Sequence, residues 1–173
     1  MRLDGRVALV TGASSGLGER FAQALAENGA AVVCAARRQD RIEAVAGRIN
    51  GSGGQAIPIR LDVTDSDALC RALDQAERTF GLVDILVNNA GISGTGSVLR
   101  AERSGWDETL AVNLTAAFEL GRFVSQRLAA AGKPGSIINI SSVLGLQANA
   151  DADYSVTKAG LVQLTRAMAL DLA

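Results

Sequence analysis

The sequence predicts an α/β fold with one parallel β-sheet and helices on both of its faces. Short apolar runs of strand length alternate with longer stretches of helical period. A glycine-rich turn directly follows the first run, and Gly29, Gly81 and Gly132 stand where helices should end. At 173 residues the chain is long enough for a substantial core, and we expect residues 1–173 to form a single domain.

Five apolar runs are the expected strands: 7–11, 31–35, 56–61, 85–88 and 136–140. Between them, apolar residues recur every three or four positions, so each helix has one face to bury against the sheet. Right-handed crossovers then give a doubly wound, Rossmann-like sheet with strand order 3-2-1-4-5. Pro58 fits the edge position that this order gives to the third strand, because proline cannot donate to ladders on both sides.

Two helices expected at 113–131 and 153–173 carry apolar residues around most of their circumference. A helix that is apolar on more than one face needs a second partner. Burial within a larger domain is one explanation, and a subunit interface is the other. We expect a homodimer or homotetramer built on these two helices.

Composition excludes several kinds of partner. The net charge is −1 at pH 7 with scattered basic residues, which gives no electrostatic footprint for nucleic acid or an acidic membrane surface. The first six residues carry charge where a signal peptide would be apolar, and no apolar run approaches the ~20 residues of a membrane span. Histidine is absent, and neither Cys34 nor Cys70 has a second cysteine at metal-ligand spacing, so we expect no metal site. We therefore expect a cytoplasmic protein whose partners are small molecules.

A glycine-rich turn at residues 11–18 follows the first strand and opens the first helix. Glycines let the backbone turn and approach a pyrophosphate closely, and a helix N-terminus offers free N–H groups and partial positive charge. A glycine-rich turn alone could be a plain connection, but its strand–turn–helix context predicts a dinucleotide cofactor. The expected cofactor contacts in this turn are Gly12, Ser14, Ser15, Gly16, Leu17 and Gly18.

The end of the second strand indicates which dinucleotide is bound. An acidic residue there would bind the ribose 2′-hydroxyl of NAD, but Ala36 occupies the position and is followed by Arg37 and Arg38. Guanidinium groups suit a 2′-phosphate, which favours NADP and leaves NAD possible. The alternative is that both arginines only solvate the start of the next helix.

Tyr154 and Lys158 are spaced four residues apart, so they lie on one helix face. An ammonium near a phenol favours the phenolate, and Tyr154 is the only tyrosine in a chain without histidine. Taken alone, a Tyr-x-x-x-Lys pattern is more often part of a surface helix. A functional role for the pattern is favoured by polar residues that accompany it. These are Ser141-Ser142 and Asn88-Asn89 at strand ends, and Asn113 in an otherwise apolar helix.

These motifs, in this order and spacing, resemble the short-chain dehydrogenase/reductase family across essentially the whole chain. By that resemblance, Asp62 and Val63 border the adenine of the cofactor. The segment Asn89, Ala90 and Gly91 supports the cofactor and the central sheet. The resemblance implies a catalytic group of four residues: Asn113, Ser142, Tyr154 and Lys158. Ser142 is assigned rather than Ser141 because the family's serine is typically followed by two residues and then glycine.

The resemblance implies hydride transfer between a nicotinamide and the carbon of an alcohol or carbonyl substrate. Tyr154 would pass a proton to or from the substrate oxygen, which Ser142 would hold. Lys158 would bind the nicotinamide ribose and stabilise the phenolate of Tyr154, and both residues would contact the cofactor. Asn113 would bend its helix to seat a relay water. The alternative is a catalytically silent dinucleotide-binding or scaffold protein of the same fold.

The resemblance also suggests that the C-terminal strands of the family are missing from this chain. The family adds strands beyond the catalytic helix, whereas this chain ends within that helix at Ala173. The fifth strand, at 136–140, would then be an apolar edge that needs cover. We therefore expect residues 1–173 to be a truncated version of a longer protein with little or no activity of its own.

Overall fold

All five expected strands are present in one parallel sheet with the expected order, β3-β2-β1-β4-β5. The computed structural model describes residues 2–94, 96–147 and 150–173. Each strand end lies within one residue of its expected position. The strands are β1 (Val7–Thr11), β2 (Ala31–Ala36), β3 (Gln55–Arg60), β4 (Ile85–Asn88) and β5 (Ser136–Asn139).

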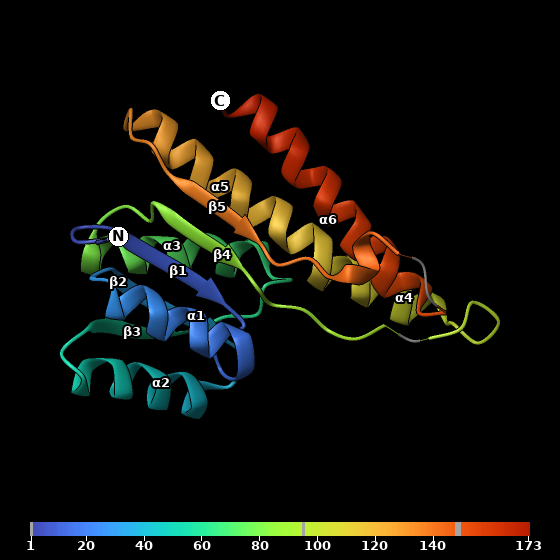
Figure 1. Cartoon of the computed structure of the whole chain (residues 1–173), viewed down its shortest axis with the longest axis horizontal. Coiled ribbons are helices and arrows are strands. Elements are labelled where there is room, and N and C mark those ends of the chain that lie inside the picture. The colour runs from blue at the N-terminus through green and yellow to red at the C-terminus, as the bar shows by residue number, and fades with distance from the viewer. Residues whose placement is uncertain (1, 95, 148–149) are drawn as a thin grey trace.

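The helices connect these strands and cover the sheet (Figure 1). One helix follows each of the first four strands along the chain. They are α1 (Gly16–Glu27), α2 (Gln39–Gly51), α3 (Ser66–Phe80) and α4 (Arg103–Leu110). A π-helical turn at Ala111–Thr115, called the π-turn below, joins α4 to α5 (Ala116–Ala130). A short 3-10 turn at Val143–Gly145 follows β5, and α6 (Ala152–Asp171) lies beside α4 and the π-turn.

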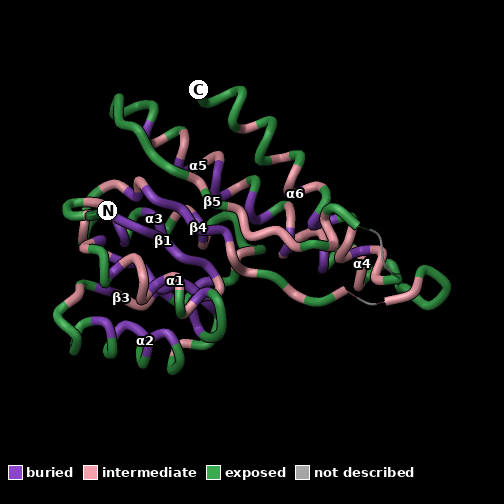
Figure 2. The backbone as a smooth tube through the Cα atoms, viewed as in Figure 1, coloured by how far each residue is buried: buried purple, intermediate pink, exposed green. Residues whose placement is uncertain are grey.

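The central strands separate two apolar layers. Ala8 and Val10 of β1 belong to the layer that contains α1 and α2, while Val7 and Leu9 belong to the layer that contains α3 and α5. Because β1 is buried on both faces, its sequence is continuously apolar from Val7 to Val10 rather than alternating. Figure 2 shows this buried centre, with exposure concentrated on outer helix faces and loops.

The two edges of the sheet differ. Pro58 lies in β3, which pairs only with β2, so the edge position expected for this proline is confirmed. At the other edge, β5 pairs only with β4, and the side chain of Ile138 is exposed. In α6, Leu161 is buried, whereas Leu170 and Leu172 are exposed.

Candidate active site

The glycine-rich turn depends on glycine at positions where a side chain would not fit. Gly12 and Gly16 have φ angles of +66° and +59°, in the left-handed region that other residues rarely adopt. A Cβ at Gly12 would lie 2.9 Å from Nδ2 of Asn89, and one at Gly18 would overlap the carbonyl oxygen of Gly12. The turn is therefore shaped for close approach of backbone to backbone, and of backbone to a ligand.

Thr11 and Asn89 tie this turn to the loop after β4. The hydroxyl of Thr11 accepts hydrogen bonds from the backbone N–H groups of Asn89 and Ala90, each at 3.0 Å, and donates to the carbonyl of Val87. The amide nitrogen of Asn89 in turn donates to the carbonyl of Thr11 at 3.0 Å. The two loops at the carboxyl ends of β1 and β4 thus form one fixed unit.

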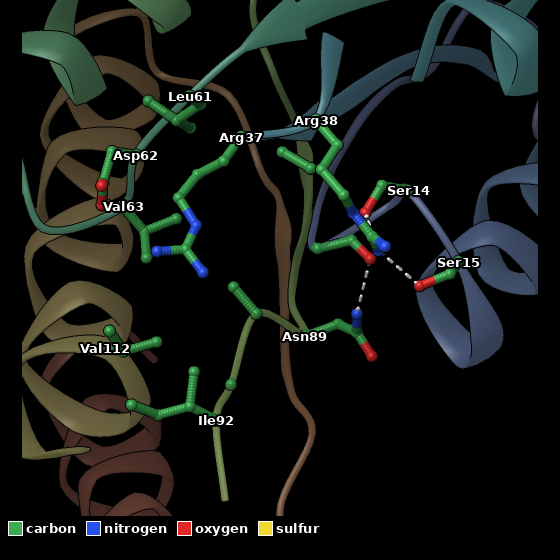
Figure 3. A pocket seen from close by; sticks show the side chains of 14 residues that line it. Ser14, Ser15, Arg37, Arg38, Leu61, Asp62, Val63, Asn89, Ile92 and Val112 are labelled. Carbon is green, nitrogen blue, oxygen red and sulfur yellow. Dashed lines mark hydrogen bonds between the residues drawn. The ribbon is translucent and has the colours of Figure 1, made fainter. Parts of the chain in front are cut away.

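A cleft of about 350 Å³ lies over this unit, at the carboxyl end of the sheet (Figure 3). Ten residues expected to contact the cofactor line it: Gly12, Ser14, Ser15, Arg37, Arg38, Asp62, Val63, Asn89, Ala90 and Gly91. Five other expected cofactor contacts are not among the lining residues: Gly16, Leu17, Gly18, Tyr154 and Lys158. The first three form the first turn of α1, where Leu17 is exposed.

Four further residues line the cleft: Ala36, Leu61, Ile92 and Val112. Sequence reasoning named Ala36 only as the non-acidic end of the second strand, and it did not single out the other three. A signal for them was present. Ile92 directly follows Gly91, and Val112 directly precedes Asn113, so each is a neighbour of a residue that the motifs did identify. Ala36 ends β2 and Leu61 directly follows β3, at the edge where a doubly wound sheet binds its ligand.

The two arginines of the cleft point in different directions (Figure 3). Nη2 of Arg38 donates to the hydroxyls of Ser14 and Ser15, each at 2.8 Å, so this guanidinium lies beside the glycine-rich turn. Arg37 extends instead toward Val63 and Asp62. Hydrogen bonds from the backbone N–H and hydroxyl of Thr64 lower the pKa of Asp62, and the charge of Arg37 adds a smaller contribution.

Lys158 is buried beside Tyr154 and close to Gly91 of the cleft. Its Nζ donates to the carbonyl of Ile140 at 2.9 Å and lies 5.6 Å from the centre of the Tyr154 ring. Burial lowers the pKa of Lys158, because desolvation disfavours the charged ammonium. A Cβ at Gly91, which lines the cleft, would lie 3.6 Å from this Nζ. The structure thus brings the Tyr154–Lys158 pair next to the expected cofactor site.

Asn113 lies in the π-turn and is only 2% exposed. Its Oδ1 accepts from the N–H of Ile92 at 2.8 Å, and its Nδ2 donates to the carbonyl of Ile92 at 3.0 Å and to the hydroxyl of Thr157 at 3.3 Å. These contacts explain how an amide is tolerated in an apolar helix. They also attach the π-turn to the wall of the cleft, and π-turns are frequent at functional sites.

The two adjacent serines have different contacts. Ser141 donates its hydroxyl to the carbonyl of Lys158 at 2.9 Å, which fastens the loop after β5 to α6. Ser142 caps the 3-10 turn, with its Oγ accepting from the N–H of Leu144 at 3.2 Å. A Cβ at Gly145 would lie 2.7 Å from the carbonyl oxygen of Lys158, so only glycine lets this turn pack so closely on α6.

Two absences hold for the part of the chain that the structure describes. No group of three or more Cys, Asp or Glu side chains is placed to hold a metal ion. Among the described helices, none combines the length and apolar character needed to cross a membrane.

Comparisons with known proteins agree with this geometry. The family model described as short chain dehydrogenase matches residues 6–173. A 3-oxoacyl-(acyl-carrier-protein) reductase FabG from Thermotoga maritima is 33% identical over 174 residues, which cover 100% of this chain and 70% of that protein. A cis-4-hydroxycyclohexanecarboxylate dehydrogenase from Sinomonas cyclohexanicum is 40% identical over 171 residues, which cover 97% of this chain and 68% of that protein.

Solved structures give the same result. A short-chain type dehydrogenase/reductase from Mycobacterium marinum superposes with a TM-score of 0.95 at 38% identity, covering 99% of this chain and 68% of that one. An actinorhodin polyketide ketoreductase variant with NADPH gives a TM-score of 0.92 at 32% identity, covering 96% of this chain and 65% of that one. The expected fold and family are both confirmed, and the chain belongs to the short-chain dehydrogenase family of oxidoreductases.

Proposed function

We propose that this chain carries the cofactor site and the proton-transfer group of an NADP-preferring oxidoreductase acting on an alcohol or carbonyl compound. One observation carries the proposal. The buried ammonium of Lys158 lies beside the ring of Tyr154 and next to Gly91, which lines a cleft together with two arginines and residues of the glycine-rich turn. A silent scaffold has no need to bury an ammonium at this place.

The residues of the cleft fit a nicotinamide dinucleotide. The left-handed Gly12 leaves room for close approach of a phosphate, and Ser14, Ser15 and Arg38 add donors beside it. When bound, the cofactor supplies or accepts the hydride. Gly91, next to the Nζ of Lys158, marks where the cleft meets the proton-transfer group.

Tyr154 is the proposed acid and base. In reduction its hydroxyl gives a proton to the carbonyl oxygen, and in oxidation its phenolate takes the proton of the alcohol. The ammonium of Lys158 stabilises the phenolate in both directions. Ser142 orients the substrate oxygen, and Asn113 supports the site from the π-turn.

The preference for NADP rests on charge. The end of β2 has Ala36 in place of an acidic residue, and both arginines that follow it line the cleft. A ribose 2′-phosphate is the anionic group that distinguishes NADP from NAD, and guanidinium groups bind phosphate well. NADPH accompanies the related actinorhodin polyketide ketoreductase, which supports the same choice. The expected cytoplasmic location stays a prediction.

The test is an assay of NADPH oxidation by the purified product of the full open reading frame, over a panel of carbonyl compounds. The names of the relatives suggest a 3-oxoacyl thioester and a cyclic ketone as members of the panel. We expect at least one compound to be reduced, and reduced faster with NADPH than with NADH. Cofactor binding without turnover of any compound would instead support the scaffold alternative.

A further inference from the structure

Four buried polar side chains form a two-rung ladder between α6 and the helical segment opposite it. Thr109 of α4 donates its hydroxyl to Oδ2 of Asp153 at 3.4 Å, and Asn113 of the π-turn donates its Nδ2 to the hydroxyl of Thr157 at 3.3 Å. All four side chains are at most 2% exposed. Thr109 and Asn113 are four residues apart, as are Asp153 and Thr157, so each pair shares one helix face.

Two residues of this ladder, Asp153 and Thr157, hydrogen-bond the backbone of Tyr154. Oδ1 of Asp153 accepts from the N–H of Tyr154 at 2.9 Å, and the hydroxyl of Thr157 donates to its carbonyl at 2.8 Å. Tyr154 lies in the first turn of α6, where backbone N–H groups have no acceptor within the helix. The side chain of Asp153 supplies that acceptor, so both peptide groups of Tyr154 are held by ladder residues.

The physical effect of such a ladder is to set register. Apolar side chains allow two helices to slide with little change in contact, whereas a buried hydroxyl or carboxylate loses its partner when it moves. The ladder also continues to the cleft, because Asn113 bonds both backbone groups of Ile92, which lines it. A continuous series of hydrogen bonds therefore joins the cofactor cleft to Tyr154 through Asn113 and Thr157.

We propose that Asp153 and Thr157 are positioning residues, which fix Tyr154 relative to the cofactor cleft through their contacts with Thr109 and Asn113. The proposal rests on the proposed function only in taking Tyr154 as the proton-transfer group. Thr157 is the sharper of the two to test, because its hydroxyl makes both the contact with Asn113 and the contact with Tyr154.

The experiment compares Thr157→Val, which loses the hydroxyl at similar size, with Thr157→Ser, which keeps it. The matched control is Thr165→Val, because Thr165 lies on the same helix, bonds the carbonyl of Leu161 at 2.8 Å and accepts from Asn139 at 2.9 Å, but is exposed. We expect Thr157→Val to lower kcat for NADPH-dependent reduction by about 10- to 100-fold, since a small misplacement of a reacting group has an effect of this size. KM for NADPH should change by less than about twofold, because the cleft itself is intact.

Thr157→Ser should restore kcat to within about threefold of the parent, and Thr165→Val should leave it unchanged. A Thr157→Val variant with parental kcat, a Ser variant as impaired as Val, or an equal loss in Thr165→Val would each overturn the proposal. If Thr157→Val fails to fold, Thr109→Val breaks the other rung, and the same drop in kcat is expected there.

A second measurement does not depend on activity. Tyr154 is the only tyrosine, so NMR signals of a sample labelled at tyrosine report this ring alone. The ring signals should shift in Thr157→Val and stay near their parental positions in Thr157→Ser and Thr165→Val. Unshifted signals in Thr157→Val would overturn the positioning role. If the parent does not reduce carbonyl compounds, the proposed function fails, while this measurement still decides the role of Thr157.

Discussion

The carboxyl group of Asp151 lies against that of Asp153 at the start of α6, and Gly94 fits beside both because it has no side chain. Desolvation raises the pKa of Asp151, as do its hydrogen bond with Asp153 and the charge of Asp153. The backbone N–H groups of Gly96 and Tyr154 oppose this rise without cancelling it. The hydrogen bond between the two carboxyl groups needs a proton, so the start of α6 is sensitive to pH.

We expect the protein to lose stability as pH rises through the raised pKa of Asp151. The folded state binds this proton more tightly than the unfolded state, so the contribution is complete below the ordinary aspartate pKa and is lost above the raised one. Because Asp151 is partly exposed, solvent limits the effect to less than about 1 kcal/mol. Asp151→Asn keeps a donor for Asp153 and should flatten this part of a plot of Tm against pH.

The control for that measurement is Asp67→Asn, which changes an exposed aspartate in the first turn of α3. This variant should keep the parental dependence of Tm on pH. An Asp151→Asn variant with the parental pH dependence would show that the carboxyl pair does not share a proton.

Arg38→Ala should weaken binding of NADPH much more than binding of NADH. Only NADPH carries the 2′-phosphate, and a charge-assisted contact to it contributes ~1.5–3 kcal/mol. Fluorescence titration with each cofactor measures the ratio of dissociation constants, and changing Arg37 and Arg38 together should give the larger change in that ratio. Arg41→Ala, an exposed arginine of α2, changes net charge equally and should leave the ratio unaltered. Equal losses for NADPH and NADH would exclude the NADP assignment.

Tyr154→Phe should abolish turnover while leaving cofactor binding nearly intact, because it removes only the hydroxyl. Acid/base catalysis is typically worth ~10²–10⁴ in rate, so we expect at least a ~100-fold drop in kcat. NADPH titration of the same variant checks that the cleft is unchanged. A variant that keeps more than about a hundredth of the parental rate would remove Tyr154 from its proposed role.

A homo-oligomer built on α5 and α6 should separate when charge is placed on its apolar surface. Phe118 of α5 and Val156 of α6 are both large apolar residues that the chain leaves about half exposed, at 46% and 48%. Light scattering should show a dimer or tetramer for the parent and a smaller species for Phe118→Asp. Leu99→Asp, at an exposed loop residue outside these helices, should keep the parental mass. A parent that is monomeric at micromolar concentration would contradict the prediction.

The sheet could be predicted from the sequence because its signals are local. Each strand is a short apolar run, and the proline of β3 identifies an edge without any knowledge of the partner strand. Most of the cleft was predictable for a related reason, since its residues follow directly on strands whose carboxyl ends meet at one edge of the sheet.

Contacts between distant helices could not be predicted in this way. Thr109 and Asp153 are 44 residues apart, and neither belongs to a motif, so only folding shows that they meet. The family resemblance implied a bend at Asn113, but the π-helical form of residues 111–115 could not be predicted, because Asn113 bonds Ile92 and Thr157 in distant segments of the chain. The adjacent Arg37 and Arg38 could not be told apart, since their different directions depend on Ser14 and Asp62 in other segments.

The hydrogen bonds of Thr11 with Asn89 and Ala90 fix the floor of the cleft independently of the loop segment that follows Ile92. They join the loops after β1 and β4 into a rigid platform before the chain reaches Ile92, beyond which the segment to α4 exposes Val98 and Leu99. Sequence change in that outer segment therefore need not disturb the floor of the proposed cofactor cleft. Loops outside this platform can therefore vary in sequence while the backbone beneath the cleft keeps its geometry.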